Sequence, residues 1–128
     1  MIRFFLAFLY LLIIEMLQPS WSIACEQPLK SGVQSERFPQ IDNKQVRTWR
    51  TIIAPNQPLK LHRHEYPRVV TVLRGGVLKS VAESGEILAV RHFKAGESYW
   101  LDADPPDQLH ACVNLGPGVI EVVVTELK

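Results

Sequence analysis

The sequence predicts an all-β domain that follows an N-terminal export signal. Short runs of Val, Ile and Leu alternate with turn residues, and the chain of 128 residues holds nine prolines and seven glycines. Beyond the N-terminal apolar run, no segment has the apolar spacing of an amphipathic helix. About eight short strands separated by turns are typical of a sandwich, a jelly roll or a small barrel. The length allows one such domain.

Residues 1–24 have the pattern of a signal peptide. One positive charge precedes an unbroken apolar run over residues 4–14, which is shorter than the roughly 20 residues that span a bilayer. Ser22 and Ala24 supply small residues before a predicted cleavage site at Cys25. An uncleaved anchor helix is the alternative. Lipidation of Cys25 is a second one, although Ser22 stands where a lipoprotein signal usually has Leu.

Export implies a periplasmic or secreted protein in an oxidising compartment. The chain has two cysteines, Cys25 and Cys112, and free thiols, an acylated Cys25 and a disulfide all remain open. The formal net charge is +1 with the two signs interspersed, which argues against a nucleic acid as partner because phosphate binding needs clustered basic residues. We expect contact with a membrane only if Cys25 is lipidated.

Residues 25–45 are polar, contain prolines and show no periodicity, so we expect an extended N-terminal arm and a domain over residues 46–128. Residues 46–53 are β-branched and aromatic, which predicts the first strand. The Pro55–Pro58 segment ends it, because proline has no N–H to donate to a ladder. A second strand is predicted over residues 59–64, which Pro67 closes.

Turn signals separate the remaining strands. A two-glycine step ends the third strand, a turn over residues 83–86 with Gly85 joins the fourth and fifth, and prolines interrupt the chain after the sixth. The last two strands flank a Gly-Pro-Gly turn. These strands are predicted over residues 68–73, 77–82, 87–93, 98–101, 109–114 and 119–126.

Three histidines carry the functional hypothesis. His62 and His64 are two positions apart, so on a strand both imidazoles share one face. His110 lies in a later predicted strand. If the fold brings them together, these three residues form a site for Zn, Fe, Ni, Cu or Mn; the alternative is an ordinary hydrogen-bonding role for each. His92 has no partner at a useful spacing and is interpreted as structural.

The faces opposite the histidines are largely apolar, and this parity predicts a homodimer in which a partner or the N-terminal arm covers them. Cys112 shares the face of His110, where it is a core residue, a ligand or a support for one, with the core favoured. Tyr99 is the aromatic residue expected to line a substrate cavity, whereas Trp49 and Trp100 are expected to pack.

The motif residues resemble those of the cupin superfamily over roughly residues 46–126. His62-x-His64 followed by a glycine pair is similar to the first cupin motif, and Gly96, Pro106, His110 and Asn114 are similar to the second. The resemblance implies a small single-domain bacterial cupin: a double-stranded β-helix, a conical jelly-roll barrel that is often dimeric, with a metal near its centre.

Two positions depart from the motifs: Arg68 stands where a glutamate ligand is usual, and Gln108 stands in place of a glycine. An arginine beside a divalent ion is repelled by it. Therefore no metal binds, or Arg68 points away, or an anion such as a carboxylate bridges the ion and the guanidinium. A structural salt bridge of Arg68 with Glu97 or Asp102 is the competing hypothesis.

Two functions remain open from the sequence. The first is a metal-dependent enzyme with Fe, Mn, Zn or Ni on three histidines, an oxidoreductase acting on a small carboxylate-bearing molecule, since cupin-type thiol dioxygenases resemble this ligand set. The second is a non-catalytic small-ligand-binding or sensory module, with or without metal. No carboxylate stands at a motif position where it would serve as a general base.

Overall fold

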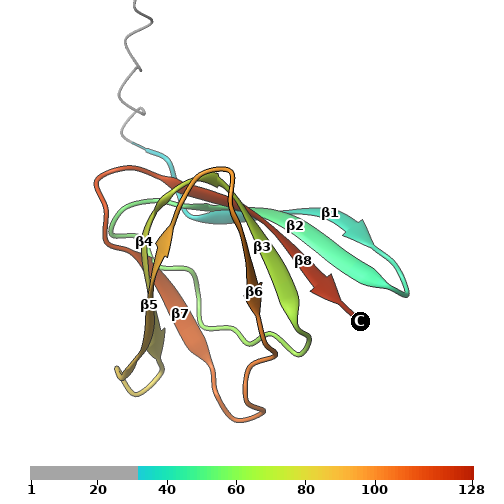
Figure 1. The fold of residues 1–128 in the computed structure, drawn as a ribbon. Coiled ribbons are helices and arrows are strands. Elements are labelled where there is room, and N and C mark those ends of the chain that lie inside the picture. The colour runs from blue at the N-terminus through green and yellow to red at the C-terminus, as the bar shows by residue number, and fades with distance from the viewer. Residues whose placement is uncertain (1–31) are drawn as a thin grey trace, which may run out of the picture. The chain divides into compact units, whose positions relative to one another are not determined.

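The computed structural model describes residues 32–128, which form strands and turns without a helix (Figure 1). Within these residues, no helix is long and apolar enough to cross a membrane. The expected signal peptide of residues 1–24 and Cys25 lie outside the described residues. The strands are β1 (Glu36–Asp42), β2 (Val46–Ile53), β3 (Arg68–Arg74), β4 (Gly76–Ala82), β5 (Ile87–Phe93), β6 (Ser98–Leu101), β7 (His110–Asn114) and β8 (Ile120–Leu127).

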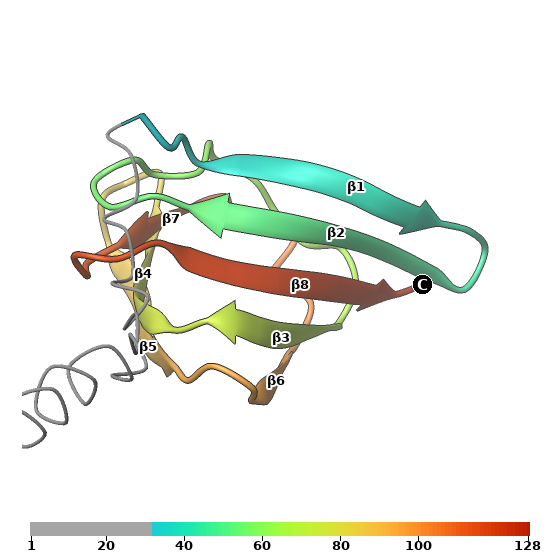
Figure 2. The ribbon, with the colours of Figure 1, turned by 90° about the horizontal axis from the view of Figure 1, so that it is seen from above.

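The strands form two antiparallel sheets. The larger has the order β1-β2-β8-β3-β6, and Figure 2 shows these strands side by side. The smaller has the order β5-β4-β7. Strand β8 lies between β2 and β3, so the last strand of the chain completes the centre of the larger sheet. The all-β prediction is confirmed.

The core lies where the inner faces of the sheets meet. In β2 and β8 every second residue is buried, as expected for strands with one covered face. Each fully buried aliphatic side chain contributes about 1.5–3 kcal/mol. The buried cluster comprises Trp49, Ile53, Val70, Val72, Leu78, Phe93, Cys112, Ile120, Val122 and Val124.

Two glycines allow close approach where the chain passes from the larger sheet to the smaller one. A Cβ atom on Gly75 would collide with the carbonyl oxygen of Phe93. One on Gly76 would lie 2.6 Å from Cγ1 of Ile120. Gly85, with φ of 89°, occupies the turn between β4 and β5 that the sequence predicts.

The structure differs from the sequence prediction before β3. Residues 36–42 form strand β1, which pairs with β2, and the compact unit begins at Gly32. The expected boundary at residue 46 therefore divides a hairpin. Pro39 and the polar composition conceal this strand, but both are tolerated because β1 lies at the sheet edge. The strand predicted over residues 59–64 is wrong: this segment is a loop with a single bridge.

Candidate metal centre

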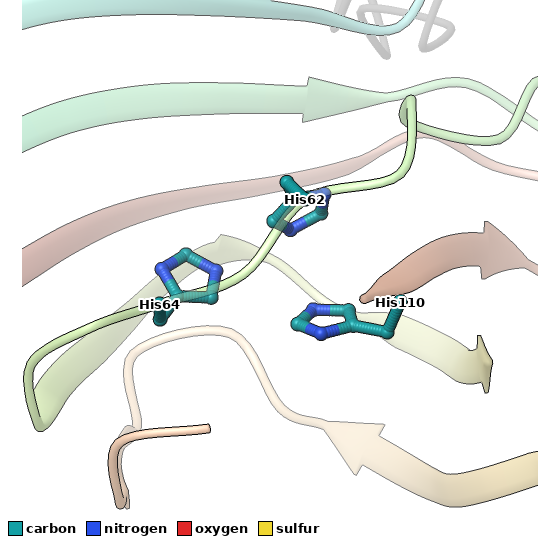
Figure 3. A group of neighbouring side chains, drawn as sticks. All are labelled: His62, His64 and His110. Carbon is teal, nitrogen blue, oxygen red and sulfur yellow. The ribbon is translucent and has the colours of Figure 1, made fainter. Parts of the chain in front are cut away.

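Three histidines from two segments lie together at one end of the smaller sheet. His62 and His64 lie on the loop between β2 and β3, and His110 begins β7 (Figure 3). The backbones of His62 and His110 exchange two hydrogen bonds of 3.0 and 2.9 Å. One candidate ligand atom from each histidine lies within 4.8 Å of the others. The predicted convergence of the three imidazoles is therefore present.

Each imidazole has an acceptor beside its Nδ1 atom. Nδ1 of His62 lies 2.7 Å from the carbonyl oxygen of Lys60, and Nδ1 of His64 lies 2.7 Å from Oε1 of Glu126. Nδ1 of His110 lies 3.3 Å from a carboxylate oxygen of Asp104. Since all three partners accept, the Nδ1 atoms carry the protons and the Nε2 lone pairs remain available. This arrangement is the usual support for metal-binding histidines.

Burial keeps the imidazoles neutral. It lowers the pKa of His62 to about 4. Burial, and next the charge of Arg68, lower the pKa of His64 to about 2. Burial also lowers the pKa of His110, with Asp104 opposing it. Neutral imidazoles are the form that coordinates a metal.

The donor set fits a divalent first-row metal that prefers nitrogen ligands. Metal–nitrogen bonds of about 2.1 Å place neighbouring ligand atoms roughly 3–3.5 Å apart. The present 4.8 Å limit on the three ligand atoms means that modest ring rotations would complete such a site.

Arg68 forms an ion pair within the protein, but with a residue that the sequence did not indicate. Its Nη1 donates to the backbone carbonyl of Asp102 at 2.8 Å, and its Nη2 donates to Oδ1 of Asp104 at 3.2 Å. Oδ2 of Asp104 accepts from the backbone N–H of His64 at 2.8 Å. One carboxylate therefore neutralises Arg68 and positions two histidines. The expected side-chain partners Glu97 and Asp102 do not fill this role.

Glu126 is the second residue that sequence reasoning missed. It is buried on β8 and orients His64 through the 2.7 Å contact. Burial raises the pKa of this carboxyl, while Arg47 opposes the shift. Glu126 continues the inward row of Val122 and Val124 at two-residue spacing. A charged residue on the apolar face of a predicted strand is the signal that would have found it.

The histidines line a cavity of about 60 Å³ between the sheets. Its walls are mostly apolar, and Arg68 and Cys112 also line it. The Sγ atom of Cys112 lies 4.0 Å from Oγ of Ser80, and burial raises the pKa of this thiol, which keeps it protonated. Cys112 also belongs to the core cluster, as the sequence favoured.

Tyr99 does not line this cavity. Its ring packs against Phe93, with centroids 5.0 Å apart. Its hydroxyl accepts from the backbone N–H of Lys94 at 3.1 Å and donates to Glu97 at 2.8 Å. Tyr99 thus stabilises the turn between β5 and β6 through these hydrogen bonds, and the structure does not bring it to the predicted site.

Of the two tryptophans expected to pack, Trp49 lies at the site, whereas Trp100 is 56% exposed. Trp49 is buried and stacks on His64, with ring centroids 5.7 Å apart and planes 4° from parallel. Its Nε1 is the one buried side-chain N or O atom without a hydrogen-bond partner in the described chain. His92, interpreted as structural, is exposed on β5.

A larger hollow, of about 430 Å³, lies beside the cavity at the hairpin of β1 and β2. Arg37, Trp49 and His64 line both spaces. Strand β1 therefore borders the opening that leads to the three histidines.

No family model and no curated protein matches the sequence. Solved structures do match. A cupin domain from Bordetella pertussis Tohama I is 23% identical with a TM-score of 0.63, over 74% of this chain and 94% of the other. An uncharacterised conserved protein with a double-stranded β-helix domain from Klebsiella pneumoniae is 21% identical with a TM-score of 0.53, over 76% and 79%.

A third similar structure is an RmlC-like cupin family protein from Methanocaldococcus jannaschii. It is 10% identical with a TM-score of 0.56, over 77% of this chain and 84% of the other. Like the Klebsiella protein, it has a double-stranded β-helix. Residues 32–128 therefore share the double-stranded β-helix fold of these structures.

Proposed function

We propose that this protein is a metal-dependent cupin in which His62, His64 and His110 hold one divalent ion, either Fe, Mn, Zn or Ni. One observation carries the proposal: each imidazole has an acceptor at Nδ1 that leaves Nε2 available. Metal-binding histidines are typically oriented in this way, by an acceptor at the ring nitrogen that does not bind the ion.

The reaction proposed for the centre is an oxidation of a small carboxylate-bearing molecule by dioxygen, which is reduced as its oxygen enters the product. The metal, when bound, supplies Lewis acidity or redox chemistry. The protein supplies three neutral ligands and, through Asp104 and Glu126, their orientation. Apolar walls around the cavity limit the access of water.

A non-catalytic ligand-binding or sensory module is the second candidate, and one observation favours it. No carboxylate lines the cavity in the described chain. Asp104 and Glu126 are engaged with the histidines and Arg68. The described residues therefore present no free general base to a ligand.

We further propose export and a homodimer. Residues 1–24 support export through their signal-peptide pattern. Leu61 and Leu109, which flank the histidines, are 44% and 41% exposed and would gain by being covered. A mass spectrum that retains residues 1–24, from protein purified from its own host, would refute cleavage. A light-scattering mass of one chain at micromolar concentration would refute the dimer.

Elemental analysis of protein exported by its own signal tests the metal centre. We expect about one divalent ion per chain, lost in a His62→Ala/His64→Ala double variant. The matched control is His92→Ala, on an exposed position of β5, which should retain the metal. Substoichiometric metal that is unchanged in the double variant would refute the site. Oxygen uptake with small carboxylic acids by the metal-loaded protein would favour the enzyme, and ligand binding without turnover would favour the module.

A further inference from the structure

Three arginines line the cavity beside the histidines: Arg37, Arg68 and Arg91. Arg37 lies on β1 directly opposite Thr51, a buried residue of β2. Because opposite residues of an antiparallel pair share a face, Arg37 is on the inner face of the larger sheet. Arg91 lies opposite the buried Leu78 in the smaller sheet. The two side chains thus approach the cavity from different sheets.

These two arginines differ from the others in their partners. Within residues 32–128, every other arginine forms an ion pair with a carboxylate, namely Arg47, Arg50, Arg63, Arg68 and Arg74. Neither Arg37 nor Arg91 has such a pair or a side-chain hydrogen bond in this part of the chain. Arg37 instead makes a cation–π contact, with its Cζ atom 5.4 Å from the centroid of the Trp49 ring. The two arginines without an ion pair in this range, Arg37 and Arg91, therefore both line the cavity.

The electrostatic consequence is a positive cavity. Three arginines and no carboxylate line it within the described chain. Arg91 is half-buried on β5, and Arg37 is exposed on the edge strand β1, where burial of part of the side chain lowers the pKa of its guanidinium. A divalent ion on the histidines would add to this positive charge. Partly buried charges of one sign are costly unless an opposite charge joins them.

We propose that the cavity binds a small carboxylate anion, with Arg37 and Arg91 as the residues that hold it. Arg68 then serves as a positioning residue, since its Nη1 already donates to the carbonyl of Asp102 and its Nη2 to the carboxylate of Asp104. The volume of about 60 Å³ admits an acid of a few heavy atoms. The hollow beyond Arg37 gives room for a longer one. This inference names the ligand class of the proposed metal centre and rests on that proposal only for the role of the ion.

Calorimetric titration with malonate tests the inference, with malonamide as an uncharged probe of the same size. Both titrations use the full-length chain from its own host, before and after removal of metal with EDTA. We expect malonate to bind in either state and malonamide to bind at least about 10-fold more weakly, because charge-assisted hydrogen bonds to guanidinium are the stronger ones. Equal binding of the two probes would overturn the inference without the use of any variant. Tighter binding of inorganic phosphate than of malonate would overturn the carboxylate class.

Variants assign the contacts. Arg37→Gln and Arg91→Gln should each weaken malonate binding by about 10-fold or more. Arg50→Gln is the matched control, because Arg50 pairs with Glu121 away from the cavity, and it should leave malonate binding unchanged. Arg37→Lys and Arg91→Lys keep the charge and the fold but lose the planar fork, so intermediate affinities are expected. Unchanged malonate affinity in both Gln variants would overturn the assignment.

The His62→Ala/His64→Ala variant separates the two proposals. If it loses metal but still binds malonate in the metal-free state, the anion site and the metal centre are both supported. If the unaltered protein binds malonate but no metal, the metal centre fails and the anion site stands. If it binds metal but no malonate, the anion site fails and the metal centre stands.

Discussion

Each end of β7 buries a polar side chain, but one is fully hydrogen-bonded within the protein and the other keeps an atom available to a ligand. At one end, Asn114 is 1% exposed and fully engaged. Its Nδ2 donates to the carbonyl oxygens of Ile53 and Gly118 at 2.9 and 2.7 Å, and its Oδ1 accepts from the N–H of Gly116 at 2.9 Å. This end joins β2 to the turn between β7 and β8. It offers nothing to a ligand.

At the other end, His110 is 6% exposed but has one supported nitrogen and one available. The neighbouring cavity is lined by two arginines, Arg37 and Arg91, that have no carboxylate partner in the described chain. A buried polar group that the chain satisfies itself stabilises the fold. A buried group held in position yet left available indicates a binding site. Within one short strand, Asn114 therefore serves the fold and His110 serves the proposed site.

Asn114→Ala should produce the largest loss of stability and leave the site intact. It removes three hydrogen bonds and strands buried backbone groups, each of which costs about 1–3 kcal/mol. We expect the free energy of unfolding to fall by about 3 kcal/mol or more, measured by urea denaturation. Metal affinity of the folded protein should not change. A variant that loses metal while remaining stable would break the distinction between the two ends.

Asp104→Asn should produce the opposite pattern. The variant leaves Arg68 without its counter-charge and weakens the support of His110, and such supporting residues typically contribute about 10–100-fold to metal affinity. We expect a loss in that range, measured by competition with a metal-binding dye. Asp107→Asn, at an exposed position of the same loop, is the control. Equal metal affinities of the two variants would show that Asp104 does not support the centre.

Acidification should destabilise the metal-free protein through the histidine end. Folding depresses the pKa of His62 to about 4 and that of His64 to about 2, so between these values and about 6.5 the unfolded state binds more protons. Stability should therefore be fully present above about pH 6.5 and decrease as the pH falls through this window. Glu126, whose pKa is raised, offsets the loss in part.

Urea midpoints of EDTA-treated protein, measured from about pH 7.5 to pH 5, give this dependence. A His64→Gln variant keeps a polar side chain that does not titrate, so its midpoint should change less with pH. The charged groups facing His64 are Arg37, Arg68 and Glu126. A stability that is flat across the window would contradict the burial of neutral imidazoles.

Tyr99→Phe should have a small effect confined to stability. The variant loses the hydroxyl contacts with Lys94 and Glu97 but keeps the ring against Phe93. A loss of about 1 kcal/mol is expected from hydrogen bonds of this kind, measured by thermal denaturation. Metal and malonate binding should match the unaltered protein. A change in malonate affinity would support the sequence prediction that Tyr99 lies at the ligand site.

Arg50→Gln should have the smallest effect of all. Arg50 pairs with Glu121 on the outer face, with 39% of its side chain exposed, and pairs of this type contribute about 0–1 kcal/mol. Its free energy of unfolding should lie within 1 kcal/mol of the unaltered protein, as an order-of-magnitude bound. A larger loss would show that an outer ion pair matters as much as the satisfied end of β7.

Local patterns predicted most of the strands. The bounds of β2, β5 and β6 agree with the predicted ranges, because alternating apolar residues and Gly or Pro turns are local signals. Strand β1 was missed because only its pairing with β2 makes it a strand. Residues 59–64 were predicted as a strand because His62 and His64 alternate as strand residues do. The segment instead has a single bridge to His110.

The ligand candidates were predictable and their supports were not. His62, His64 and His110 are recognisable by residue type and spacing. Asp104 is one of three aspartates in a short loop, and the sequence does not reveal which of them faces Arg68. Glu126 becomes a partner of His64 only because β8 inserts beside β3. Pairing between distant strands determined both contacts.

The reciprocal backbone bonds between His62 and His110 also bear on how the site forms during folding. They join a loop near the middle of the chain to a strand near its end, so the entropy of closing a long loop must be overcome before the third imidazole joins the first two. An ion that binds the completed trio therefore favours the native state over the denatured ensemble by mass action. Removal of the ion with a chelator would then lower the free energy of unfolding, because the bound ion stabilises the contact between the loop and β7.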